Sequence, residues 1–195
     1  MRRVAPSQRR IGEYLVLHSM FTLIIDTAAG VLAGALLLRF WMQAIRVRPP
    51  ISVAQFVFQL SDWLVRPLRK MLPGFGGYDW ASLLGAFIVA ILAMVVDVWV
   101  MSTFSLQTIL LMAVLRVLQW IFYGFMGLLV IEANFSWVNP HAPLAPFARA
   151  LNDPILRPLR RVIPLVGNID LSPLVALILL RIALQLVSTL ILSFA

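Results

Sequence analysis

Hydrophobic residues fill four long stretches of this chain, and polar residues gather between them. The stretches cover residues 15–43, 81–102, 107–132 and 171–194. Each is long enough to cross a bilayer, which takes about 20 residues. A short uncharged link joins the second stretch to the third, whereas long basic segments follow the first and the third. The pattern therefore predicts an all-α membrane protein with four transmembrane helices, in which the two middle helices form an antiparallel hairpin.

The two basic segments, residues 44–80 and 133–170, share a motif that we call the basic block. The first copy contains Asp62, Arg66, Pro67, Arg69, Lys70, Pro73, Gly76 and Asp79. The second copy contains Asp153, Arg157, Pro158, Arg160, Arg161, Pro164, Gly167 and Asp170, at the same spacing and 91 residues later. This duplication predicts a basic N-terminal tail (residues 1–14) followed by two tandem repeats (residues 15–102 and 107–195).

Each basic segment also shows the apolar spacing of an amphipathic helix. On a helix the three basic residues of a block share one face, because they stand at positions i, i+3 and i+4. Each repeat is therefore predicted to run helix, amphipathic interfacial helix, helix.

The other residues of the block are predicted to shape this interfacial helix. Asp62 and Asp153 are expected to cap its N-terminus. The first proline of each block should bend it, because proline removes a helical hydrogen bond. The second proline should end it, and the glycine should allow the turn into the next helix. Asp79 and Asp170 are placed to cap that next helix.

The number of helices places both basic segments on the same side of the membrane, because each repeat crosses it twice. The repeats are then parallel and related by an axis along the membrane normal. The excess of basic residues in these segments favours a cytoplasmic location for them, with both termini outside. Arginines at positions 2, 3, 9 and 10 favour the opposite orientation.

Composition supports a membrane protein and excludes several classes of site. The chain is 62% hydrophobic and 12% charged, whereas a soluble domain carries about 25% charged residues. A net charge of +8 in such a chain points to anionic lipid, not to nucleic acid. There is no cysteine, and His18 and His141 are far apart, so no metal site and no cofactor is expected.

Charged residues inside the predicted spans are costly and count as functional candidates. They are Asp26, Asp97, Arg116 and Arg181. The first three fall at similar depths and can meet, and a structural ion pair of Arg116 with one of the two aspartates is favoured over an ion or proton path. Arg39 and Glu132 are expected near the interface, in contact with solvent.

The duplicated block, together with Leu36 to Gln43 and Phe135 to Trp137, resembles the YggT family, also called YlmG-like membrane proteins. The resemblance covers nearly all of the chain beyond about residue 20. It implies a multi-pass protein of the bacterial plasma (inner) membrane or of plastids, with no settled biochemical activity. Relatives are associated with cell-division loci, with plastid cytochrome-complex assembly and with osmotic or ion stress.

The sequence contains no nucleophile elbow, phosphate loop or paired catalytic side chains, so we expect no enzyme. The main hypothesis is a scaffold or assembly factor for membrane complexes, which docks on anionic lipid or a partner protein. The residues assigned to docking are Arg66, Arg69, Lys70, Arg157, Arg160 and Arg161. A plain topology anchor explains these charges equally well. The alternative function is a small oligomeric ion channel or transporter that uses Asp26, Asp97 and Arg116, and a homo-oligomer is open in either case.

Overall fold

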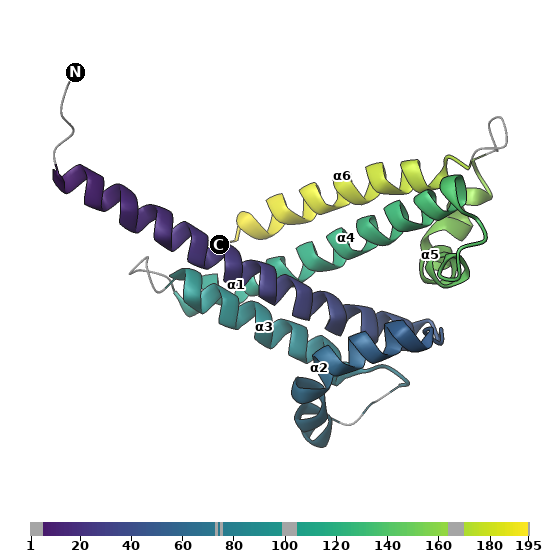
Figure 1. Ribbon diagram of the computed structural model, residues 1–195, viewed down its shortest axis with the longest axis horizontal. Coiled ribbons are helices and arrows are strands. Elements are labelled where there is room, and N and C mark those ends of the chain that lie inside the picture. Colours follow the sequence, from purple (N-terminus) through teal and green to yellow (C-terminus); the bar gives the residue numbers. More distant parts are fainter. Residues whose placement is uncertain (1–5, 73, 75, 99–104, 164–169, 195) are drawn as a thin grey trace.

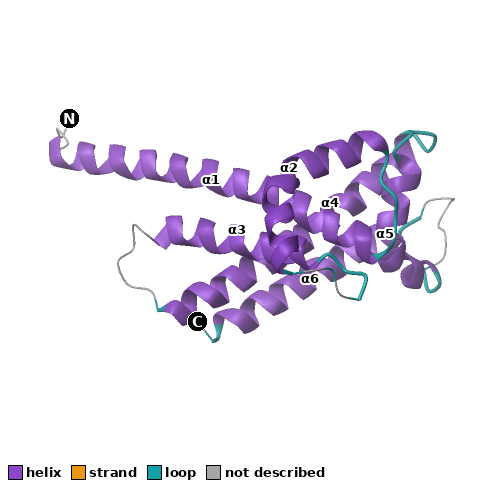
Figure 2. Cartoon of the chain, turned by 90° about the horizontal axis from the view of Figure 1, so that it is seen from below, coloured by secondary structure: helices purple, strands orange, loops and turns teal. Residues whose placement is uncertain are grey.

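The computed structural model describes residues 6–72, 74, 76–98, 105–163 and 170–194, and these residues form six helices and no strand (Figures 1 and 2). In chain order the helices are α1 (Pro6–Ala44), α2 (Ile51–Met71), α3 (Trp80–Val98), α4 (Leu106–Val138), α5 (Ala145–Arg160) and α6 (Ser172–Leu192). The all-helical class expected from the sequence is therefore confirmed for the described residues.

Three helices are long and apolar enough to cross a membrane. The candidate spans are Ser19–Ala44 in α1, Leu106–Val138 in α4 and Ser172–Leu192 in α6. The apolar part of α3, Trp80–Val96, is shorter, and the predicted end of this helix at residue 102 lies outside the described residues. The fourth transmembrane helix therefore stays a prediction.

Two helix boundaries differ from the predicted ones. Helix α1 begins at Pro6, so part of the expected N-terminal tail is helical. Helix α4 continues to Val138 instead of ending at residue 132, because nothing in the sequence from 133 to 138 breaks a helix. This extension keeps Glu132 within the packed part of the helix.

The helices pack as two groups of three. Helix α1 contacts α2 and α3, and α4 contacts α5 and α6, while α1 and α3 both contact α4. Helix α1 lies beside α3 and α4 lies beside α6, and the two pairs diverge toward the end that carries α2 and α5, away from the two chain termini (Figure 1). Helices α2 and α5 therefore lie at the end of the bundle where α1 and α4 end and where α3 and α6 begin.

Small and aliphatic side chains form the core between the long helices. The main cluster joins α1, α2, α3 and α4, and includes Ala33, Leu36, Val65, Ala86, Ala90 and Ala113, all nearly inaccessible. A smaller cluster of Met42, Val57 and Leu151 connects α1 and α2 with α5. Next to it the indole Nε1 of Trp41 donates to the Leu151 carbonyl at 3.0 Å. This bond ties the first group of helices to the second.

Helices α2 and α5 start earlier than the block predicts. Asp62 and Asp153 lie well inside α2 and α5, so the prediction that they cap the N-termini is wrong. The physical reason is the prolines upstream. Pro50 immediately precedes α2 and a proline occupies the first turn of α5, where the missing N–H is not needed.

The remaining block residues occupy the ends and interiors of these helices. Pro67 and Pro158 lie inside α2 and α5, and α2 changes direction along its length (Figure 1). Gly76 has a φ of 68°, in the left-handed region that glycine adopts without strain, in the turn before α3. Pro73, Pro164 and Gly167 lie outside the described residues.

Candidate functional site: two buried charge clusters

The first cluster of charges lies where α1, α2 and the start of α3 meet, and consists of Arg39, Asp62, Arg69 and Asp79. Arg39 comes from α1 and is only 7% exposed. Its Nη1 donates to Asp62 Oδ1 at 2.6 Å and to Ser61 Oγ at 2.9 Å, and its Nε donates to Asp79 Oδ2 at 3.2 Å. The guanidinium also lies over the ring of Phe58, 4.8 Å from the ring centroid. Arg39 therefore connects three segments through one side chain.

Asp79 is the most deeply buried member of the first cluster, at 2% exposure. In addition to Arg39 it accepts from Arg69, at 3.3 Å from Nε and 2.6 Å from Nη2, and from Ser82 Oγ at 2.7 Å. Burial alone would raise the pKa of Asp79, but the hydrogen bonds from Arg69 and Ser82 outweigh it, and the pKa lies below its usual value. The carboxylate is thus held ionised between two arginines.

Asp62 lies closer to solvent and carries the second negative charge of this cluster. Its carboxylate accepts from Arg39 and, on the outer side, from Arg66 at 2.8 Å. The hydrogen bond from Arg39 lowers the pKa of Asp62, against the effect of burial, and Arg66 lowers it further. Two positive and two negative charges therefore balance within the first cluster.

The second cluster lies where α4, α5 and the start of α6 meet, and consists of Glu132, Arg160 and Asp170. Arg160 donates from Nη2 to Glu132 Oε1 and from Nε to Asp170 Oδ2, both at 2.8 Å. Asp170 also accepts from the backbone N–H of Ser172 at 2.9 Å, at the start of α6. The cluster therefore joins three helices, as the first one does.

The pKa values of this cluster shift in the directions that keep the ion pairs formed. For Arg160, burial alone would lower the pKa, but the hydrogen bonds to Asp170 and Glu132 raise it above its usual value. For Asp170, burial alone would raise the pKa, but the bonds from Arg160 and Ser172 lower it below its usual value. Both groups are charged at neutral pH.

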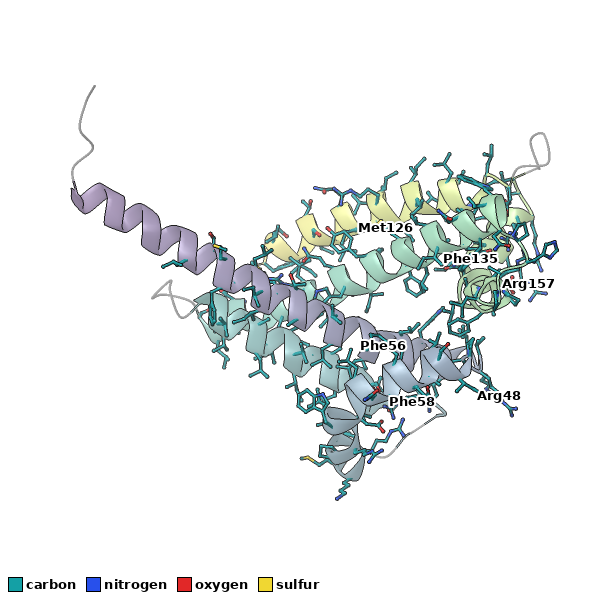
Figure 3. The ribbon with its side chains drawn as sticks, viewed as in Figure 1. Arg48, Phe56, Phe58, Met126, Phe135 and Arg157 are labelled. Carbon is teal, nitrogen blue, oxygen red and sulfur yellow. The ribbon has the colours of Figure 1, made fainter. Side chains whose placement is uncertain are left out.

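The structure divides the six predicted docking residues into two kinds. Arg69 and Arg160 are partly exposed, at 46% and 31% of their side chains, but bind aspartates of the protein itself, and in both blocks the aspartate follows the arginine by 10 residues. Arg66, Lys70, Arg157 and Arg161 are exposed. Figure 3 shows Arg157 at the outer edge of the molecule, beside α5. Of these four, Arg66 is paired with Asp62 at 2.8 Å, so Lys70, Arg157 and Arg161 are the ones available to an external ligand without breaking an ion pair between described residues.

Two residues essential to the clusters contradict the sequence interpretation. Arg39 and Glu132 were expected in contact with solvent, but they are only 7% and 4% exposed. The signal that points to them is their position near the end of an apolar helix, next to a segment that carries charges of the opposite sign. No ion pair joins Asp153 to another residue in the described ranges, so the two blocks differ there.

The charges within the predicted spans are only partly paired. Arg116 Nη1 lies 3.4 Å from Asp26 Oδ1, which links α4 to α1. Arg181 is exposed on α6. The side chains of Asp97 and His18 lie outside the described part of the chain, so the predicted approach of Asp97 stays a prediction. Within the described residues, no group of three or more histidines, cysteines and carboxylates is placed to hold a metal ion.

These observations define a helical membrane protein with long apolar helices and two clusters of ion pairs at one end of the bundle. The CCB3/YggT family matches residues 18–101 of the chain and, a second time, residues 111–191. The chain therefore belongs to the CCB3/YggT family, as the resemblance implied.

Curated relatives from three bacteria support this assignment. A protein of Escherichia coli K12 named YggT, described as uncharacterized, is 33% identical over 162 residues, which cover 83% of this chain and 85% of the relative. An uncharacterized protein of Haemophilus influenzae Rd is 32% identical over 83% of this chain and 88% of its own length. An uncharacterized protein of Vibrio alginolyticus is 30% identical, with 82% and 89% covered. No solved structure matches the fold significantly.

Proposed function

We propose that this protein is a non-enzymatic scaffold or assembly factor of the bacterial inner membrane. In this proposal α2 and α5 are amphipathic helices that lie at the cytoplasmic surface and present basic side chains to anionic headgroups. The observation that carries it is the division within each basic block. One arginine of each block binds the aspartate 10 residues later, and the neighbouring Lys70, Arg157 and Arg161 are exposed.

The ion pairs of Arg69 and Arg160 hold α2 and α5 in place, and this sets where the neighbouring basic side chains point. Arg69 is held by Asp79, and Arg160 is held by Asp170 and Glu132. Arg157 stands three residues before Arg160 on the same face of α5, and Lys70 and Arg161 each follow the paired arginine by one residue. Lys70, Arg157 and Arg161 are all exposed. A rigid array of basic groups at a membrane surface attracts anionic lipid, with each group contributing about 1 kcal/mol.

The tandem-repeat architecture belongs to the same proposal. Both halves have a long helix, a shorter basic helix and a second apolar helix, in the same order. Both have an Arg–Asp bond across 10 residues of the block, and the family matches each half separately. We infer that duplication produced two surface helices, which give the protein a wider docking face than one repeat provides.

The ion pair between Asp26 and Arg116 bears on the alternative channel function. A cation path needs a carboxylate that is free to bind and release its ion. Asp26 instead lies 3.4 Å from Arg116 on the neighbouring helix. This contact favours a packing role for both residues and counts against the channel.

The test compares two triple variants reconstituted in vesicles that contain phosphatidylglycerol and phosphatidylcholine. Spin-labelled lipids report, by electron paramagnetic resonance, how strongly the protein prefers phosphatidylglycerol. The variant with Lys70, Arg157 and Arg161 changed to glutamine should lose most of this preference. The control with Arg46, Arg48 and Arg149 changed to glutamine removes the same number of exposed charges from the same end of the bundle, and should keep most of it.

A plain topology anchor makes the opposite prediction for this pair of variants. If the basic residues act only by their number, both triple variants lose the preference equally. That result, or an unchanged preference in both, would contradict lipid docking by the blocks.

A further inference from the structure

Arg181 stands in the middle of a candidate span and faces outward. Helix α6 runs from Ser172 to Leu192, and Arg181 follows Ser172 by nine residues, or about 14 Å. The span is also the least covered of the three, with 11% of its apolar segment buried, against 22% in α1 and 17% in α4. A charge at this depth in contact with lipid tails is costly, so a partner group is expected.

Polar side chains extend this exposed position into a stripe. Gln185 and Thr189 follow Arg181 at four-residue intervals and are also exposed. Residues four apart lie on the same face of a helix, one above the other. The opposite side of α6 carries Ser172 and Ala176, which are buried against the rest of the protein. The stripe therefore points away from the bundle.

Within the described residues no ion pair joins Arg181 to a carboxylate, and the carboxylates of the neighbouring helices are already paired. Asp26 of α1 is bridged to Arg116. Glu132 of α4 and Asp170 before α6 are both held by Arg160. A second copy would therefore have to break one of these ion pairs to offer Arg181 a carboxylate.

We propose that the stripe of Arg181, Gln185 and Thr189 docks a membrane-spanning helix of another protein that carries a carboxylate near the middle of the bilayer. This inference rests on the proposed scaffold function and names the chemistry of its partner. The carboxylate binds the guanidinium with paired hydrogen bonds, which are strong where water is scarce. The Gln185 amide extends the contact along the helix by interhelical hydrogen bonds, and the Thr189 hydroxyl, which donates to the Gln185 carbonyl at 3.0 Å, is left to accept one.

The test uses the full chain in vesicles and a synthetic polyleucine helix of about 20 residues with one central aspartate. The chain has no cysteine, so a single introduced cysteine reports contact without background. Gln185→Cys places a thiol on the stripe, and the peptide carries a cysteine one turn from its aspartate. Leu179→Cys is the matched control, because it is also exposed but lies about 160° around the helix from Arg181.

The expected result is disulfide cross-linking at position 185 that exceeds cross-linking to an all-leucine peptide by roughly threefold to tenfold. Arg181→Leu should abolish the excess. Arg181→Glu should transfer it to a peptide with a central arginine. Position 179 should show no excess in any of these backgrounds.

Several results would overturn the inference. Equal cross-linking of the aspartate and leucine peptides shows that the stripe does not recognise the carboxylate of the peptide. An excess that survives Arg181→Leu shows that Arg181 is not the group that binds the aspartate. Cross-linking between two copies through Gln185→Cys, lost with Arg181→Leu, assigns the stripe to self-association. The preference of Arg181→Leu for phosphatidylglycerol, measured in parallel, separates failure of this inference from failure of lipid docking.

Discussion

Replacing Arg39 by methionine tests whether the first charge cluster holds α2 against the long helices. Methionine keeps a long flexible side chain but removes the charge and all donors. The substitution removes the hydrogen bonds to Ser61 (2.9 Å), Asp62 (2.6 Å) and Asp79 (3.2 Å). All of these bonds lie at a site where Arg39 is only 7% exposed.

The magnitude follows from what remains after the substitution. Removing one member of a buried ion pair costs about 3–5 kcal/mol, because the other charge is left uncompensated. Here each carboxylate keeps a second arginine, Arg66 for Asp62 and Arg69 for Asp79. We therefore expect the lower end, about 3 kcal/mol. For a chain of this size that corresponds to a fall in melting temperature of about 6–12 °C.

The assay is thermal unfolding in mild detergent, followed by circular dichroism. Arg66→Met is the matched control, because it removes an arginine from the same Asp62, but one that is 77% exposed. An exposed pair of this kind contributes about 0.3–0.5 kcal/mol, so the control should melt within about 2 °C of the wild type. Equal melting temperatures for the two variants would show that the buried network does not stabilise the fold.

Three further predictions follow from the same contacts. Arg160→Leu leaves Glu132 buried without its donor and should lower the free energy of unfolding by about 3–5 kcal/mol. Arg157→Leu, at an exposed position, should lower it by less than about 1 kcal/mol. Similar losses in the two variants would contradict a stabilising role for the second cluster. The pKa of Asp79 is lowered on folding, so its contribution is complete above the ordinary value of 3.8 and is lost as pH falls through the lower folded-state pKa. Melting temperatures measured between neutral pH and about pH 3 should therefore fall less for Asp79→Asn than for the wild type, and parallel curves would refute this assignment. Trp41→Phe removes the 3.0 Å hydrogen bond to the Leu151 carbonyl of α5 and should lower the free energy of unfolding by about 1 kcal/mol in the same assay. An unchanged melting temperature would show that this bond does not couple the two groups of helices.

The apolar pattern predicted the helices well because it depends on local sequence alone. Long runs without charge indicate spans wherever they occur, and the repeated block lies within or next to both α2 and α5. The pairing of Arg69 with Asp79 was not predicted, although both residues were singled out. Their bond requires the chain to turn back over 10 residues, and that turn depends on Gly76 and the packing of α3. Tertiary contacts of this kind leave little trace in a local pattern.

Arg39 and Glu132 show where sequence reasoning failed and why. Both lie near the end of an apolar helix, where a charged side chain can reach water or turn inward with equal ease. The direction depends on the neighbouring basic helix, which covers each position and supplies a partner of opposite sign. A charged residue at such a depth, beside a segment that carries opposite charge, is therefore a candidate for burial.

The two clusters keep the same Arg–Asp bond but exchange the sign of the residue that the long helix provides. In the first half an arginine from α1 binds the aspartates, and in the second a glutamate from α4 binds the arginine. The first cluster is therefore balanced, whereas the second holds one more negative than positive charge. Among the described residues, the buried oxygens that lack a hydrogen-bond partner are one in the first half, at Asp26, and three in the second, at Glu132, Asn152 and Ser172.

This difference indicates which half is held more firmly. Unpartnered buried polar atoms weaken a site, because each one has lost its hydration without a replacement. The ion pairs of the second cluster should therefore break more readily than those of the first, although both clusters use the same basic block. Since the Arg–Asp bond persists while its span partner differs, the bond itself is the part of the duplicated unit that places the basic helix. The charge on the long helix then sets how tightly each half is closed.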